Sequence, residues 1–162
     1  MLGETVIGGV FNQFAGGKGA NQAVAAKRSG VDVQFICAVG DDDFGKSSLN
    51  LYADEGIKLQ GAKSFNGEAS GVALIMVNEK GENSISVASG ANSRLSSKCL
   101  EEHRELFQQA NGLLIQLETP LETVKYALSI AHDFGLPVIL NPAPACELSE
   151  DILSKVYCLT PN

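Results

Sequence analysis

The residues whose types and spacing best suit ligand binding form a glycine-rich turn that leads into a helix. They are Gly16-Gly17-Lys18-Gly19, followed by Asn21. Glycine lets a backbone approach a ligand closely, and the free N–H groups of a first helical turn bind oxygen atoms. Lys18 adds further donors, and the amide of Asn21 suits a sugar hydroxyl because it both donates and accepts. The pattern favours a small-molecule site, but it also fits a tight turn that simply begins a helix.

Two common phosphate-binding motifs do not match this turn. A P-loop requires Ser or Thr after its Gly-Lys pair, but Gly19 follows Lys18 here. The dinucleotide fingerprint requires a third glycine at the position that Gln22 occupies. The turn is therefore neither of these standard phosphate loops.

The elements that must position the turn alternate between strands and helices, which predicts an α/β fold with a mostly parallel sheet and crossover helices. Apolar and β-branched runs predict strands, and amphipathic runs with capping residues predict helices. The expected strands are Val6–Phe11, Val33–Val39, Leu113–Leu117, Val138–Leu140 and Val156–Leu159. The expected helices are Ala20–Arg28, Phe44–Glu55, Leu95–Ala110, a helix capped by Thr119 and ended by Gly135, and Glu150–Lys155.

The middle of the chain breaks this alternation. Val72–Val77 and Ser84–Val87 flank Asn78-Glu79-Lys80-Gly81, which predicts a β-hairpin that stands beside the sheet. Before the second expected helix, Asp41-Asp42-Asp43 lacks the spacing of a calcium loop, so we expect it to cap that helix.

Composition excludes several classes of protein. The chain has 162 residues, which fits one domain, and 44% of them are hydrophobic, enough for a core. A net charge of -7 argues against a nucleic-acid partner, because phosphate binding depends on Lys and Arg. The apolar run Val72–Val77 is far too short to span a membrane, so no membrane partner is expected.

Cysteine usage favours a reducing compartment and no metal site. The four cysteines are Cys37, Cys99, Cys146 and Cys158, and none forms a Cys-x-x-Cys pair. Glu4 interrupts any apolar stretch near the start, so a secretory signal is not expected. We therefore expect reduced thiols, no bound metal among these residues and a cytoplasmic location.

The segment GGKGANQAVAA, which begins at Gly16, is similar to the sugar-binding signature of ribokinases in the PfkB carbohydrate kinase family. AVGDDDFGKSSLNLYADEGI, SGVALIMVNEKGEN, LLIQLETP, NPAPA and LTPN follow in matching order, so the resemblance runs from Gly3 to Asn162. It implies a ribokinase-like sheet with flanking helices, incomplete here, and a small β lid hairpin. Residues 1–162 would form one partial α/β domain, with lid segments near 5–11, 59–64 and 71–88.

The resemblance also implies a sugar site. Gly16, Gly17, Lys18 and Asn21 match the residues that hold the sugar hydroxyls. Glu118 matches an acidic residue near the sugar, and it follows an expected strand, where α/β sites lie. The alternative for Glu118 is a charge favoured at a helix N-terminus.

Two further groups of residues come from the same resemblance. Ala73, Ile75 and Val87 match apolar lid contacts over the sugar, although they also fit plain packing within the hairpin. Asn141 and Asn162 match asparagines that line the nucleotide and phosphate region, and Asn162 would begin an Asn-x-x-Glu motif that bears on magnesium and phosphate. The alternative for Asn141 is a turn residue before a proline.

The activity that the resemblance implies is ATP-dependent phosphorylation of D-ribose at its 5-hydroxyl, with Mg²⁺ and, in the full-length protein, a monovalent cation such as K⁺. A homodimer through the lid is implied as well. The family's catalytic aspartate belongs to a Gly-Ala-Gly-Asp motif, which does not occur in these 162 residues, so we expect the base beyond Asn162 and the family's first strand before Met1. The chain alone is then expected to be inactive. The alternatives are a non-catalytic sugar-binding or partner-binding fragment, or a kinase for a related pentose or nucleoside.

Overall fold

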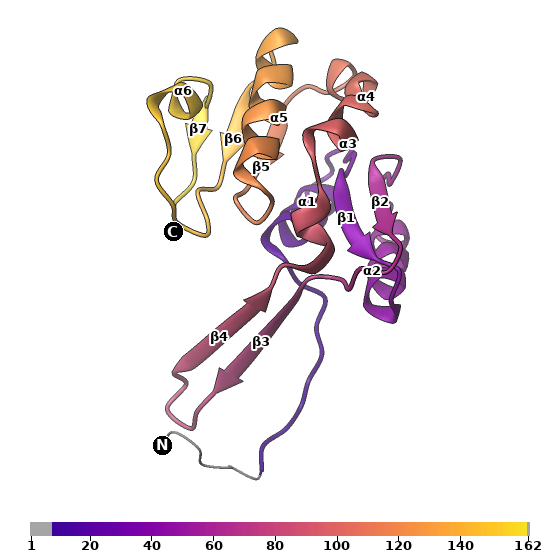
Figure 1. The fold of residues 1–162 in the computed structure, drawn as a ribbon, viewed down its shortest axis with the longest axis vertical. Helices are drawn as coiled ribbons and strands as arrows, with labels where there is room; N and C mark the ends of the chain where they lie inside the picture. Colours follow the sequence, from indigo (N-terminus) through magenta and orange to yellow (C-terminus); the bar gives the residue numbers. More distant parts are fainter. Residues whose placement is uncertain (1–7, 162) are drawn as a thin grey trace.

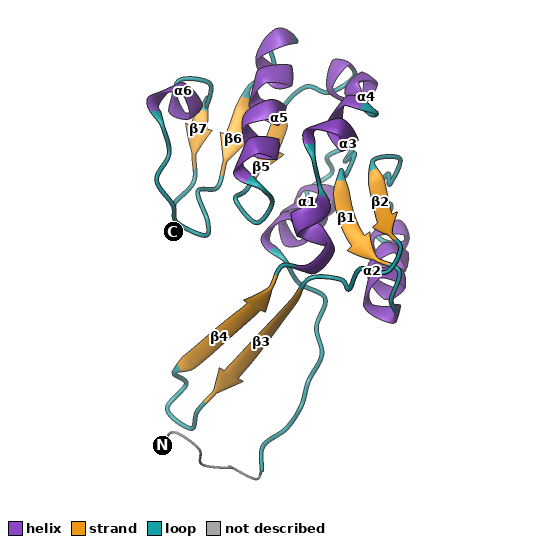
Figure 2. Ribbon diagram, in the orientation of Figure 1, coloured by secondary structure: helices purple, strands orange, loops and turns teal. Residues whose placement is uncertain are grey.

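The computed structural model describes residues 8–161 (Figures 1 and 2). Its helices are α1 (Lys18–Arg28), α2 (Asp43–Asp54), α3 (Ser97–Glu101), α4 (Arg104–Gln108), α5 (Leu121–Asp133) and α6 (Glu150–Leu153), with a 3₁₀ turn at Gly90–Arg94. Its strands are β1 (Cys37–Gly40), β2 (Ala62–Phe65), β3 (Val72–Val77), β4 (Asn83–Ala88), β5 (Leu113–Ile115), β6 (Val138–Leu140) and β7 (Cys158–Leu159).

Parallel pairing dominates the body of the molecule, as the alternation of elements predicts. β1 pairs with β2, and β6 lies between β5 and β7, all in parallel register. β3 and β4 form the expected antiparallel hairpin. Within residues 8–161 no ladder of hydrogen bonds joins β1 to β5, so the parallel strands form two groups. Ile36 packs against core clusters on both sides and connects the two groups.

The core beneath β5–β7 is formed by α5. Val124 and Leu128 lie on one face of this helix and are 0% exposed, and they pack against Val138 and Leu140 of β6. Burial of each such side chain contributes about 1.5–3 kcal/mol. This packing fixes the end of β5, from which the candidate site is built.

The start of α5 differs from the prediction. Pro120, not Thr119, is the N-cap residue, and no side chain caps the helix. Glu122 forms an ion pair with Lys125 at 2.7 Å instead of closing a capping box. By contrast, Asp42 caps α2 as expected, because its Oδ1 accepts from the Gly45 N–H at 2.8 Å.

Two other predictions of local structure were wrong. The helix expected over Leu95–Ala110 is two short helices, separated where His103 leaves helical geometry at φ −128° and ψ 29°. Leu100 and Phe107 still face the same cluster, and the apolar periodicity is the same for a continuous helix and a kinked one. Residues 8–11 form no strand, because the positive φ of Gly8 and Gly9 does not suit an extended ladder; the rest of that predicted strand lies outside the described residues.

The β3–β4 hairpin projects away from the body (Figure 1). Apolar side chains on both of its faces are 55–68% exposed, among them Leu74, Ile75, Met76, Ile85 and Val87. A two-stranded ribbon is marginally stable alone in water, so these faces favour contact with another surface. Residues 59–61 lead into β2, and residues 62–64 belong to β2 and pair with β1 in the body. None of the described helices has the length and apolar character needed to cross a bilayer.

Candidate functional site

The site begins at the N-terminus of α1, where the chain enters the helix through glycine. Gly17 is the N-cap residue, and its φ of 92° lies in the region that favours glycine. The helix has no side-chain cap of its own and no acidic residue in its first turn. Its first N–H groups therefore need an acceptor from elsewhere in the fold.

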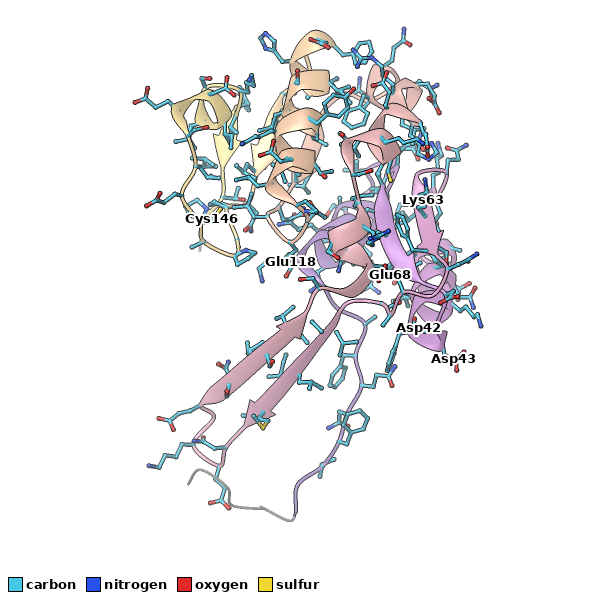
Figure 3. The ribbon with its side chains drawn as sticks, viewed as in Figure 1. Asp42, Asp43, Lys63, Glu68, Glu118 and Cys146 are labelled. Carbon is cyan, nitrogen blue, oxygen red and sulfur yellow. The ribbon has the colours of Figure 1, made fainter. Side chains whose placement is uncertain are left out.

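Glu118 supplies that acceptor from the segment after β5. The Lys18 N–H donates to Glu118 Oε2 at 2.7 Å, and Lys18 Nζ lies 3.5 Å from Glu118 Oε1. The Glu118 carboxylate thus caps α1 and forms an ion pair with Lys18 at the same time. Figure 3 shows Glu118 between the end of β5 and α1.

The pair is open to a ligand. The Lys18 and Glu118 side chains are 41% and 34% exposed. Gly17 lies beside them, since a Cβ built on it would be 3.9 Å from Glu118 Oε2. Asn21 is on the same helical turn, and its N–H donates to the Gly17 carbonyl at 2.9 Å. The structure therefore brings Gly17, Lys18, Asn21 and Glu118 together, with Gly16 next to them in the chain.

A second contact between α1 and β5 is absent from the sequence predictions. Gln116 Nε2 donates a hydrogen bond to Gln22 Oε1, one position after Asn21. Gly19 makes room for it, because a Cβ there would lie only 2.8 Å from Gln116 Oε1. The available signal was the single polar residue, Gln116, in an otherwise apolar run before Glu118.

Asn141 follows β6, so it lies at the carboxyl end of the strand next to β5. Its N–H donates to the Ile115 carbonyl at 2.9 Å. Its side-chain Oδ1 is buried and has no hydrogen-bond partner among the described residues. Buried acceptors are nearly always paired, so this oxygen can accept a hydrogen bond that the described residues do not supply. Asn162 lies outside the described residues.

The predicted lid residues share one face of the hairpin. Ala73 pairs with Val87 and Ile75 pairs with Ile85, which places their side chains on the same side of the ribbon. The hairpin projects away from the body that holds Lys18 and Glu118 (Figure 1), and Ile75 and Val87 are exposed. The structure thus aligns the three residues with one another but does not bring them onto the α1 turn.

The arrangement at α1 is suited to orienting a polyhydroxyl compound. Lys18 offers a charged donor and Glu118 a charged acceptor, and bonds to charged groups are the stronger class of hydrogen bond. Within residues 8–161 no group of three His, Cys, Asp or Glu side chains is arranged to hold a metal ion.

Comparison with known proteins identifies the class. Residues 2–162 match the pfkB family of carbohydrate kinases. The chain is 46% identical to the ribokinase of Haemophilus influenzae over 160 residues, covering 99% of this chain and 52% of that protein. It is 37% identical to the deoxyribokinase of Salmonella typhi over 161 residues, covering 99% of this chain and 53% of that protein.

Solved structures agree with the sequence comparison. The structure of the Arabidopsis thaliana ribokinase complexed with ribose and ATP superposes with a TM-score of 0.88 at 29% identity, over 98% of this chain and 52% of that one. The chain belongs to the PfkB carbohydrate kinase family, and within it the chain is similar to ribokinases. It spans about half the length of the curated relatives that it matches.

Proposed function

We propose that this chain forms the sugar-binding part of an ATP-dependent ribokinase that phosphorylates D-ribose at its 5-hydroxyl. The observation that carries the proposal is the accessible Lys18–Glu118 pair at the N-terminus of α1. The similarity to a ribokinase from Haemophilus influenzae, and to a structure described as a complex with ribose and ATP, supports ribose as the sugar.

Each part of the site has a role in this proposal. Gly16 and Gly17 let the backbone approach the sugar, while Lys18, Asn21 and Glu118 orient its hydroxyls. Ala73, Ile75 and Val87 close over the bound sugar as an apolar lid. Asn141, together with Asn162, lies on the nucleotide side.

The co-substrate and its ions follow from the same assignment. ATP with Mg²⁺ supplies the phosphoryl group, and a monovalent cation such as K⁺ supports the complete enzyme in the cytoplasm. The buried Oδ1 of Asn141 is the described atom that best fits a contact on this side.

A binding experiment tests the sugar site. Glu118→Gln keeps one oxygen to accept from the Lys18 N–H but removes the charge, so we expect ribose affinity to fall by about 10- to 100-fold, the usual loss for a hydrogen bond to a charged group. Calorimetric titration of the chain with ribose measures the effect.

The control is Glu122→Gln, which removes the same charge from the exposed pair with Lys125 and should leave ribose affinity unchanged. A parallel titration with deoxyribose addresses the related pentose. Equal ribose affinity in Glu118→Gln and the unaltered chain would rule out the assigned sugar site, and preferred binding of deoxyribose would rule out ribose as the substrate.

The hairpin supports a further part of the proposal, a homodimer through the lid. If Ala73, Ile75 and Val87 face the sugar, then Leu74 and Met76 on the opposite face are left for a second copy; they are 63% and 68% exposed. We expect Leu74→Asp to weaken dimerisation by about 100-fold, since it removes a large apolar contact and buries a charge.

Light scattering of the complete protein at micromolar concentration measures the oligomeric state. Asn83→Asp is the control, because it introduces the same charge on the other face of the ribbon, where Asn83 pairs with Val77. A monomeric unaltered protein would contradict the dimer, and so would dimers that survive Leu74→Asp.

A further inference from the structure

The hairpin joins the body through a narrow neck made of two Ser-Gly dipeptides, Ser70-Gly71 before β3 and Ser89-Gly90 after β4. The two limbs are in direct contact. The Ala91 N–H donates to the Ala69 carbonyl at 2.8 Å, and a Cβ on Gly71 would lie 2.9 Å from the Ser89 carbonyl oxygen. The absence of side chains at the glycines therefore allows the limbs to pass backbone to backbone.

One limb of the neck is tied to the body by Asp42. Its Oδ2 accepts from the Ser70 N–H at 2.8 Å, and its Oδ1 accepts from the Ser70 hydroxyl at 2.6 Å. Ser70 is only 7% exposed, and its Oγ accepts in turn from the Gly40 N–H at 2.9 Å. The two bonds to the Asp42 carboxylate are charge-assisted, and such bonds are stronger than bonds between neutral groups.

The same carboxylate also begins α2, so three segments converge on it. Asp42 Oδ1 accepts from the Gly45 N–H at 2.8 Å. Glycine is required around it, because a Cβ on Gly40 would lie 2.5 Å from Ser70 N and a Cβ on Gly45 would lie 2.9 Å from Ser70 Oγ. The Ser70 hydroxyl and N–H, and then the Gly45 N–H, hold the pKa of Asp42 below its usual range. Figure 3 shows Asp42 near the end of β1, where α2 begins.

We propose that Asp42 and Ser70 form a latch that sets the orientation of the β3–β4 hairpin on the body, with Asp42 as a positioning residue for the lid. The role of the hairpin as a lid rests on the proposed function, whereas the Asp42–Ser70 contact is a property of the fold alone. Asp42 holds the segment before β3 through Ser70, and the segment after β4 is held by the backbone bond from Ala91 to Ala69. Together these contacts define the point about which the hairpin can turn. Release of Ser70 from Asp42 frees the hairpin to change its angle.

The substitution Asp42→Asn separates the latch from the helix cap. Asparagine is a good N-cap residue, so its oxygen still accepts from the Gly45 N–H. Its NH₂ group is a donor and cannot accept from the Ser70 N–H, so that bond is lost. We expect amide hydrogen exchange at Ser70 and Gly71, and through the hairpin, to become about 10- to 100-fold faster, while exchange within α2 is unchanged.

The control is Asp43→Asn, one position along, where the side chain is fully exposed and pairs with Lys46 at 3.7 Å. It should leave exchange in the neck and hairpin unchanged. Ser70→Ala removes the hydroxyl bond to Asp42 Oδ1 but keeps the Ser70 N–H bond to Oδ2, so it should also accelerate exchange in the neck and hairpin. Because the two substitutions weaken one contact through different bonds, the acceleration in the double variant should fall short of the sum of the two single effects.

The experiment is carried out on the chain without sugar, so its result is independent of ribose binding. Unchanged exchange at Ser70 and Gly71 in Asp42→Asn would overturn the latch, as would equal acceleration throughout α2 or full additivity in the double variant. A latch that behaves as expected in a chain that binds no ribose would instead reject the proposed function and leave the hinge in place.

Discussion

A purified polypeptide of these 162 residues is expected to release no ribose-dependent ADP above background. Phosphoryl transfer needs a base at the attacking hydroxyl and donors for the developing charge on the phosphoryl group, and in the proposed sugar site the one charged donor, Lys18, and the one carboxylate, Glu118, are paired with each other. Its acidic group, Glu118, is held by the Lys18 N–H and ammonium and is placed to orient a hydroxyl. A positioned base contributes about 10²–10⁴ in rate, and one preorganised donor about 10²–10³.

A coupled assay of ADP release at saturating ribose and ATP measures this, with the ribokinase of Haemophilus influenzae as the positive control. Calorimetry on the same preparation shows whether ribose is bound. Ribose binding without ADP release would show that the site is folded and lacks catalytic groups, whereas no binding would show that the site is not formed. Turnover at about 1–100 per second, the range of ordinary kinases, would contradict the expectation.

The local part of the site was predictable from sequence because it depends on neighbours in the chain. The glycines around Lys18 predict a turn that begins a helix; the helix was expected from Ala20 and begins at Lys18, two residues earlier. The apolar periodicity of Val124 and Leu128 predicts the buried face of α5. In each case the residue types and their spacing carry the structural information.

The residue pattern by itself does not predict the long-range part, because a single sequence does not say which polar groups meet in space; the family resemblance alone placed Glu118 near Lys18. The cap of α1 comes from Glu118, 100 residues from Lys18. The same holds for the Gln116–Gln22 bond and for the contact of Asp42 with Ser70, which depend on how the strands are ordered. Helix capping by Asp42 was expected, but its second role required the neck of the hairpin to fold back onto β1.

The pairing of strands was limited in the same way. Apolar runs predict strands, but a run of apolar residues does not define where hydrogen bonding stops. The strand expected over Val33–Val39 is shorter in the structure, where β1 covers Cys37–Gly40. Before β1 the described residues form only an isolated bridge between Gln34 and Lys58. The glycines that allow close approach explain part of this: a Cβ on Gly61 would lie 2.6 Å from Ile36 Cγ1, so the neighbouring segment crosses there at close range.

We expect two of the four cysteines to react rapidly with a thiol reagent and two to react slowly. For Cys37 the slow reaction follows from the raised pKa of its thiol. Cys37 is the half-buried first residue of β1, and desolvation of its thiol raises the pKa of Cys37 to about 12. The thiolate is the nucleophile, so at pH 8 about one part in 10⁴ of Cys37 would be reactive, against about a quarter for the ordinary pKa of about 8.5. The thiolate fraction, and with it the rate of reaction, is therefore lower by about 10³ even before steric protection is considered.

Titration of the folded chain with a chromogenic disulfide at pH 8 measures the reaction. Cys146 and Cys158 are exposed and should react rapidly, whereas Cys37 and the buried Cys99 should react only when denaturant is added. Cys146→Ser and Cys158→Ser serve as matched controls, each removing one rapid thiol and leaving the slow ones unchanged.

The same pKa predicts the direction of a stability change in alkali. Between the two pKa values the folded state keeps the Cys37 proton that the unfolded state loses. The contribution of Cys37 to the free energy of unfolding is therefore complete below about pH 8.5 and declines as pH rises toward the folded-state pKa of about 12. Cys37→Ala should flatten the loss of stability over that range, as followed by denaturant unfolding at several pH values. Rapid labelling of Cys37 in the folded chain, or an identical alkaline profile in Cys37→Ala, would show that the thiol is not held in the buried environment that the structure describes.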